Sequence, residues 1–145
     1  MIEYYKCQSK AIFVEVPPST ATATTESVEL APLGTMACLR AFSGFSSAPG
    51  NLNPSLTGAG NGTLVSVEFH MKDASETTVL EILLPLHPPQ QAFDVGGSGG
   101  SGMSFHIPGP GILFDQGLGV KMVIPANPTA SNGPIMGLLN LVYSV

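Results

Sequence analysis

This sequence contains very little charge. Five Lys and Arg residues and ten Asp and Glu residues make up 10% of its 145 residues, whereas soluble domains average about 25%. Between Pro32 and Ser66 only Arg40 is charged, and no charge follows Lys121. A free monomer of this composition exposes large neutral surfaces and tends to associate. Either the chain is a small secreted domain with a bland surface, or its surface is covered by copies of itself and by neighbours; we favour the second.

Basic clusters and long apolar runs are also missing. The net charge is −5 and no run of Lys or Arg occurs, which argues against nucleic-acid binding because phosphates attract cationic side chains. No apolar segment approaches the roughly 20 residues that cross a bilayer, so we expect no membrane partner. Residues 1–10 are charged before any apolar stretch, so we expect an N-terminal arm rather than a secretion signal, and assembly in a host cytoplasm.

Cysteine is scarce as well. Cys7 and Cys38 are the only two cysteines, too few for a disulfide scaffold. Cys38 lies in a predicted strand and is expected to be a small buried side chain. The sequence leaves undecided whether these two cysteines form a disulfide.

Residues that could support metal binding or catalysis lack the spacing for it. His70, His87 and His106 form no His-x-x-x-His pattern, and we interpret them as structural surface or interface residues. Asp94 and Asp115 lie near glycine turns, where Asp commonly hydrogen-bonds its own backbone. We therefore predict a protein that is not an enzyme and has no cofactor or metal.

The hydrophobic pattern has the period of two that indicates strands. The 13 Pro and 17 Gly residues are scattered at intervals that disfavour helices. We expect a single all-β domain over residues 1–145, an antiparallel, jelly-roll-like β-sandwich of about eight strands. The expected strands are 11–16, 20–30, 35–42, 64–71, 77–84, 103–107, 118–124 and 138–145.

Two segments are expected to be long loops. Ser43–Gly62 is rich in Gly, Asn, Pro and Ser and has no charge. Gly96–Gly102 has the composition of a flexible linker. An engineered insert would also have this composition, but its place between two strands favours a natural hairpin loop.

The run Phe105–Val120 reads FHIPGPGILFDQGLGV, and the chain then ends on a strand that contains Leu141-Val-Tyr143. This pattern resembles small β-sandwich virion proteins of tailed bacteriophages, in which a P-x-G-I-x-F-x-x-G-L-x-V run precedes a closing strand with a Tyr. The Leu64–Leu84 hairpin also resembles the central strands of that family. We expect inward side chains and a turn glycine with positive φ in this run: Ile112, Phe114, Leu118 and Val120 inward, and Gly117 in the turn.

The resemblance implies a virion component without catalytic residues, either a capsid decoration (cement) protein or a head–tail accessory protein. Such proteins are commonly trimers, so the implied partners are copies of the chain and the major capsid protein or other virion proteins. The alternative is a tail, collar or receptor-binding module that recognises a host-surface glycan through Ser43–Gly62 and Ala92–Gly102. We predict these subunit contacts: Tyr4, Tyr5, Phe45, Leu52, Leu56, Ile135 and Met136.

Overall fold

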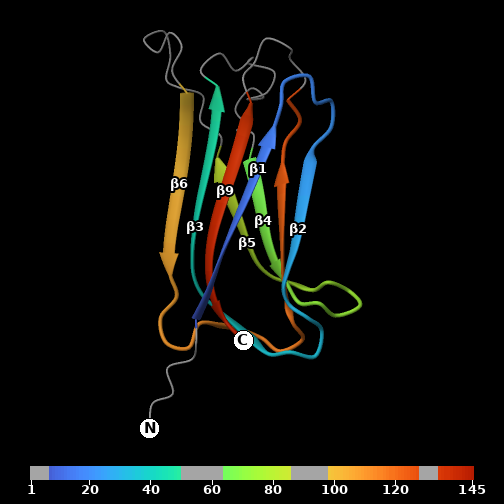
Figure 1. Cartoon of the computed structure of the whole chain (residues 1–145), viewed down its shortest axis with the longest axis vertical. Coiled ribbons are helices and arrows are strands. Elements are labelled where there is room, and N and C mark those ends of the chain that lie inside the picture. Colours follow the sequence, from blue (N-terminus) through green and yellow to red (C-terminus); the bar gives the residue numbers. More distant parts are fainter. Residues whose placement is uncertain (1–6, 50–63, 86–97, 128–133) are drawn as a thin grey trace.

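A computed structural model describes residues 7–49, 64–85, 98–127 and 134–145 of the chain, and these form nine strands and no helix (Figure 1). The predicted all-β fold is confirmed. None of the described residues forms a helix that could span a membrane. The strands are β1 (Cys7–Val16), β2 (Thr24–Ala31), β3 (Ala37–Pro49), β4 (Leu64–His70), β5 (Thr78–Pro85), β6 (Ser98–His106), β7 (Ile112–Phe114), β8 (Leu118–Ile124) and β9 (Ile135–Ser144).

The strands form two antiparallel sheets. Sheet 1 has the order β1-β9-β3-β6, with the short β7 paired to β3, and sheet 2 has the order β2-β8-β4-β5. Figure 1 shows β6, β3, β9 and β1 side by side, with the strands of sheet 2 as a second layer. The predicted antiparallel sandwich is therefore confirmed, with β7 as a strand that the hydrophobic pattern did not indicate.

The pairing has the topology of a jelly roll. β4 pairs with β5, β3 with β6, β2 with β8 and β1 with β9, so the chain is one long hairpin folded at the β4–β5 turn. The hairpin is then rolled up, which adds the pairs β3–β9 and β4–β8. Rolling one long hairpin into two sheets produces this strand order, and it is a known solution for antiparallel sandwiches.

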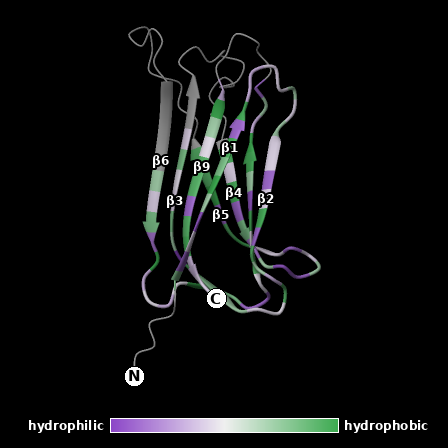
Figure 2. Ribbon diagram, in the orientation of Figure 1, coloured by the Kyte–Doolittle hydropathy of each residue, from purple (hydrophilic) through white to green (hydrophobic). Residues whose placement is uncertain are grey.

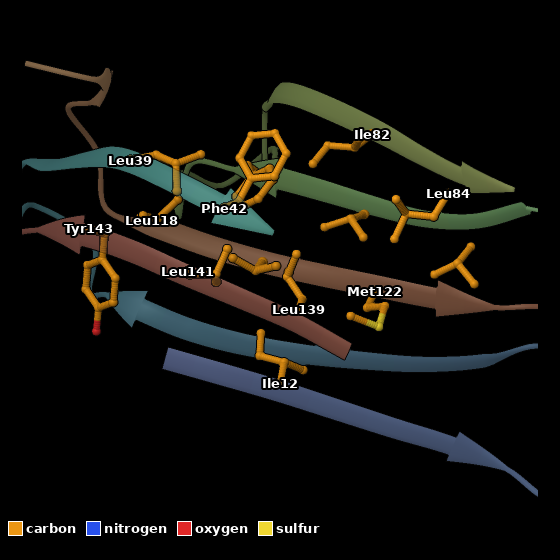
Figure 3. Packing of buried hydrophobic residues seen from close by; sticks show 14 of the residues in the cluster. Ile12, Leu39, Phe42, Ile82, Leu84, Leu118, Met122, Leu139, Leu141 and Tyr143 are labelled. Atoms are coloured by element: carbon orange, nitrogen blue, oxygen red, sulfur yellow. The ribbon is translucent and has the colours of Figure 1, made fainter. Parts of the chain in front are cut away.

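Alternating side chains of both sheets fill the space between them. Figure 3 shows side chains from strands of the two sheets pointing toward one another, among them Leu139, Leu141, Met122 and Leu84. The inward residues of β8 are fully buried, as are those of β4. This period-two burial explains why Leu118–Ile124 was predicted with its observed bounds.

Small inward residues on sheet 1 allow the sheets to approach closely. A Cβ atom added at Gly44 would lie 2.8 Å from Leu84 Cδ1, and one added at Gly137 would lie 2.9 Å from Ile124 Cδ1. These two glycines therefore serve packing, because large side chains of sheet 2 occupy the space that a Cβ would need.

Both segments expected to be loops are partly strand, which corrects the sequence-based prediction. β3 continues to Pro49 and β6 begins at Ser98, and the two pair in register from Ala41–His106 to Pro49–Ser98. Glycine and serine carry no hydrophobic alternation, but their backbone groups still pair when a neighbouring strand is present. Residues 7–10, expected in an N-terminal arm, likewise belong to β1 and pair with β9.

The run that carries the family resemblance folds as expected from its residues. Phe114, Leu118 and Val120 are fully buried, and Ile112 is partly buried against the core. Gly117 has φ +84, and its N–H donates to Thr35 O at 2.9 Å. A Cβ at Gly117 would lie 2.6 Å from Pro32 O. Glycine is required there both for the turn and for the close approach of the backbone.

Candidate functional site

The formal charges gather on the outward face of sheet 2 and on the β4–β5 turn. Lys121 Nζ lies 3.5 Å from Glu68 Oε2, and Lys72 Nζ in the turn lies 3.9 Å from Glu29 Oε2. Ser66 Oγ also donates to Glu81 Oε1 at 3.2 Å. Figure 2 shows hydrophilic residues on this turn. These exposed ion pairs add little stability, but their charged groups make this side of the molecule hydrophilic.

The outward face of sheet 1 is nearly uncharged, and we call it the neutral face. Among the described residues of the neutral face as defined below, only Glu15 is charged. Arg40 lies just beyond it on the same side of sheet 1, where its Nε donates to Ser144 Oγ at 3.2 Å. Phe13, Leu138 and Phe45 form one row across β1, β9 and β3, because Phe13 pairs with Leu138 and Leu138 with Phe45. Phe13 is 57% exposed and Phe45 is 48% exposed. The described neutral face comprises Ser9, Ala11, Phe13, Glu15, Ala41, Ser43, Phe45, Ser104, His106, Met136, Leu138, Asn140 and Val142.

A second apolar surface lies at the open side of the sandwich between β5 and β6. This β5–β6 groove has a volume of about 370 Å³ and is lined by Phe42, Leu80, Glu81, Ile82, Met103, Phe105, Ile107 and Ile112. The Phe105 ring stacks on Phe42 with centroids 5.7 Å apart and planes at 14°. Phe105 is nevertheless 53% exposed, so the groove leaves part of an aromatic ring in contact with solvent.

The part of the chain that the structure describes contains no cluster of His, Cys, Asp or Glu suited to a metal ion. His70 is buried, 5% exposed, and its ring lies over Gly119, where a Cβ would collide with His70 Nε2. The expectation of a surface position is therefore corrected for His70, whereas His106 is exposed on the neutral face. His87 and Asp94 lie outside the described residues, and Asp115 is exposed beside the Gly117 turn.

The two cysteines are free: Cys7 is exposed and Cys38 is half-buried. Cys38 is thus less buried than the sequence indicated. Both residues pair with Ser144, Cys7 from β1 and Cys38 from β3, on opposite sides of β9. Two strand spacings separate them, about 10 Å, which is too far for a disulfide without backbone movement.

The predicted contact residues fall into three groups. Phe45 and Met136 lie on the neutral face, Phe45 exposed and Met136 half-buried. Ile135 is fully buried in the core, so the expected contact role is corrected: it has no surface to offer a neighbour. The others lie outside the described residues: Tyr4, Tyr5, Leu52 and Leu56. Phe13 and Phe105 are also exposed aromatic residues in strands, and neither was among the predicted contacts.

The β4–β5 turn is organised by Asp73. Thr77 donates to its carboxylate twice, from the backbone N–H at 2.9 Å and from the hydroxyl at 2.8 Å. These hydrogen bonds, the backbone one first, hold the pKa of Asp73 below its usual value of 3.8. The carboxylate therefore stabilises the folded state above that value and loses this effect as the pH falls through the lower folded pKa.

Replacing Asp73 with alanine should lower the urea midpoint at neutral pH, because the two hydrogen bonds from Thr77 are lost. The difference from the unchanged chain should shrink as the pH drops below 3.8. Equilibrium unfolding in urea at a series of pH values measures this. Asp115→Ala, in an exposed position at another turn, is the control. A difference that stays constant with pH would contradict the role given to the Asp73 carboxylate.

Comparison with known proteins gives no family assignment. No family model matches the chain, and no curated protein matches it. Among solved structures, a chain of the Bacillus endospore appendages, which form disulfide-linked pili, is 10% identical with a TM-score of 0.39, over 97% of this chain and 90% of that one. A CBM4 structure is 13% identical with a TM-score of 0.35, over 92% and 82%. The decameric BFDV capsid protein is 10% identical with a TM-score of 0.36, over 97% and 96%. At these values the likenesses carry no argument about function.

Proposed function

We propose that this chain is a non-enzymatic structural subunit of a virion, folded as one domain over residues 1–145. The observation that carries the proposal is the contrast between the two outward faces. Sheet 1 presents a neutral face with exposed Phe13 and Phe45, while the ion pairs lie on sheet 2 and its turn. A row of large apolar side chains across neighbouring strands, on a face with few charges, is typical of a surface that a neighbour covers.

Within this class we propose a capsid decoration protein of a tailed phage, as the resemblance of Phe105–Val120 implies. The neutral face would lie against the shell built by the major capsid protein, and the charged face of sheet 2 would face water. Repetition around a shell makes such a contact effective, because many weak apolar contacts together stabilise the assembled state. The trimer that the resemblance implies belongs to the same proposal.

Immunogold labelling of particles from cells that produce the chain tests this assignment. Label spread regularly over the head would support a decoration protein. Label confined to the tail or collar would contradict decoration and leave a virion component, and particles without label would overturn the proposal as a whole.

Replacing Phe45 with aspartate should weaken binding of the purified chain to shells stripped of it by about tenfold or more, because a large buried side chain contributes about 1.5–3 kcal/mol. Co-sedimentation with stripped shells measures the affinity. Leu83→Asp is the matched control: Leu83 is 46% exposed on the outward face of β5 in sheet 2. If both variants bind shells equally, the neutral face is not the shell contact.

A further inference from the structure

The outer edge of β6 lacks the features that usually protect a sheet edge. The strand orders end on β1 and β6 in sheet 1 and on β2 and β5 in sheet 2. Three of these four strands contain charged residues: Lys10 and Glu15 in β1, glutamates in β2, and Glu81 in β5. β6 reads SGGSGMSFH and contains no Asp, Glu, Lys, Arg or Pro. Edge strands expose backbone N–H and C=O groups, and natural proteins block them with charge, proline or bulges. An unblocked edge is suited to pairing with another strand.

When two copies of β6 pair antiparallel, the small residues of one lie opposite the large residues of the other. Its first half contains only glycine and serine, its second half contains Met103 and Phe105, and Gly102 is the middle residue of Ser98–His106. When two copies pair antiparallel around Gly102, Phe105 of one lies opposite Gly99 of the other, and Met103 lies opposite Ser101. An aromatic ring across from a strand glycine covers its exposed backbone. Sheet 1 already contains such a pair, Phe45 opposite Gly102.

The β5–β6 groove lies directly beside this edge. Met103 and Phe105 point toward sheet 2, since they pair with the inward residues Gly44 and Phe42. They are nevertheless 39% and 53% exposed. A second β6 added to sheet 1 would bring its own Met103 and Phe105 to the same side, next to the open groove. These side chains would cover apolar surface that the isolated chain leaves in water.

We propose that β6 pairs antiparallel with β6 of a second copy, on a two-fold axis through Gly102. This pairing deepens the proposed function. It rests on that function in one respect only, namely that the chain is a repeated subunit. Self-pairing of β6 places no like charges opposite one another, whereas β2 and β5 both contain glutamates. The contact is the same on both copies, so it closes as a pair instead of growing into a filament.

Cysteine cross-linking tests the axis and the register. In the full chain with Cys7 and Cys38 changed to serine, Gly102→Cys should form disulfide-linked dimers under mild oxidation, because residue 102 lies opposite itself. Ser9→Cys, on the outward side of the β1 edge, is the control. A mixture of Ser101→Cys and Met103→Cys chains should give more dimer than either alone. The pairing would be overturned if disulfide-linked dimers formed no faster with Gly102→Cys than with Ser9→Cys. It would also be overturned if mixed samples gave cross-links between residues 102 and 9.

Charge at the axis gives a second, non-covalent test. Gly102→Lys and Gly102→Glu should each weaken self-association about fivefold at low salt, since like charges then lie directly opposite. Their mixture should restore it, and Gly102→Ala should retain it. Sedimentation velocity measures association, and circular dichroism verifies that each variant is folded. If the Gly102→Lys sample, the Gly102→Glu sample and their mixture associate equally, β6 does not pair about a two-fold axis through Gly102. Immunogold labelling is scored separately, so cross-linked dimers with unlabelled particles would refute the virion role and keep the pairing.

Discussion

Replacing Phe69 with alanine should lower the free energy of unfolding by about 3–5 kcal/mol. Phe69 is fully buried in β4. Its ring centroid lies 5.6 Å from that of Phe42 on sheet 1, so this side chain joins the two sheets across the core. Removing the ring leaves a cavity that the paired strands on both sides of β4 prevent from collapsing. Because natural domains have a total stability of about 5–15 kcal/mol, the loss is a large fraction of it.

The matched control is Phe13→Ala, which removes the same atoms from the neutral face. Phe13 is 57% exposed, so its loss should change the free energy of unfolding by at most about 0.5 kcal/mol. Urea unfolding of both variants, followed by circular dichroism at concentrations below self-association, measures the two effects. Similar losses for the two variants would contradict the assignment of Phe69 to the core and of Phe13 to a solvent-facing surface.

This pair of phenylalanines also separates folding from assembly. A chain with Phe13→Ala should remain folded and still lose affinity for shells, since the proposed contact face is the outward side of sheet 1. A chain with Phe69→Ala should bind shells in proportion to the fraction that is folded. Binding measured per folded molecule therefore distinguishes a contact residue from a residue that only holds the fold.

The strands with an alternating pattern could be predicted from the sequence because one of their faces is buried. Leu118–Ile124 places four large apolar residues inward, all fully buried, and Leu64–His70 does the same with Val65, Val67 and Phe69. In these strands the alternation of apolar and other residues directly indicates which face is buried. The β4–β5 hairpin and the sandwich class follow from such strands and from the turns between them.

The glycine-rich strand could not be recognised in the same way. Ser98–Gly102 has no apolar alternation, and its strand conformation depends on backbone pairing with Phe45–Pro49 of β3. That partner lies about 50 residues away in the sequence, and only the roll of the hairpin brings it near. Local composition therefore indicated a loop, whereas long-range pairing determines a strand.

The positions of the proposed contact residues were predicted unevenly for a related reason. β9 was expected to begin at residue 138, but it begins at Ile135, and this extension places Ile135 on the inward face with Leu139. Phe45 was selected as an apolar residue in a supposed loop, and the structure gives it an outward position in β3. The separation of charge between the two faces depends on which strands share a sheet, which no local pattern reveals.

Replacing Gly111 with alanine should lower the free energy of unfolding by about 2–5 kcal/mol, well beyond the cost of the same change at Gly109. Both glycines have positive φ, +91 at Gly111 and +68 at Gly109. For alanine this conformation alone costs about 1–2 kcal/mol. At Gly109 nothing lies within 4 Å of an added Cβ, whereas at Gly111 the Cβ would collide with the backbone carbonyl oxygen of Leu39.

The collision at Gly111 cannot be relieved by rotating a side chain. Leu39 lies in β3 and pairs with Ile112 on one side and with Tyr143 on the other, so movement of its carbonyl would disturb two ladders. The strand is already irregular here, between Leu39 and Ala41, and Arg40 O accepts a hydrogen bond from Ile107 N at 2.9 Å. Gly111 thus allows the chain to pass over this irregularity and begin β7.

Thermal and urea unfolding of Gly109→Ala and Gly111→Ala, side by side, measure the difference. Equal losses would mean that positive φ alone makes glycine necessary at both positions. A larger loss at Gly111 would show that close packing against β3 determines this position of the Phe105–Val120 run. In either case Gly111 has a structural role in the connection from the edge strand β6 back to the core. The contacts that we propose with neighbouring subunits lie elsewhere, on the neutral face and along β6.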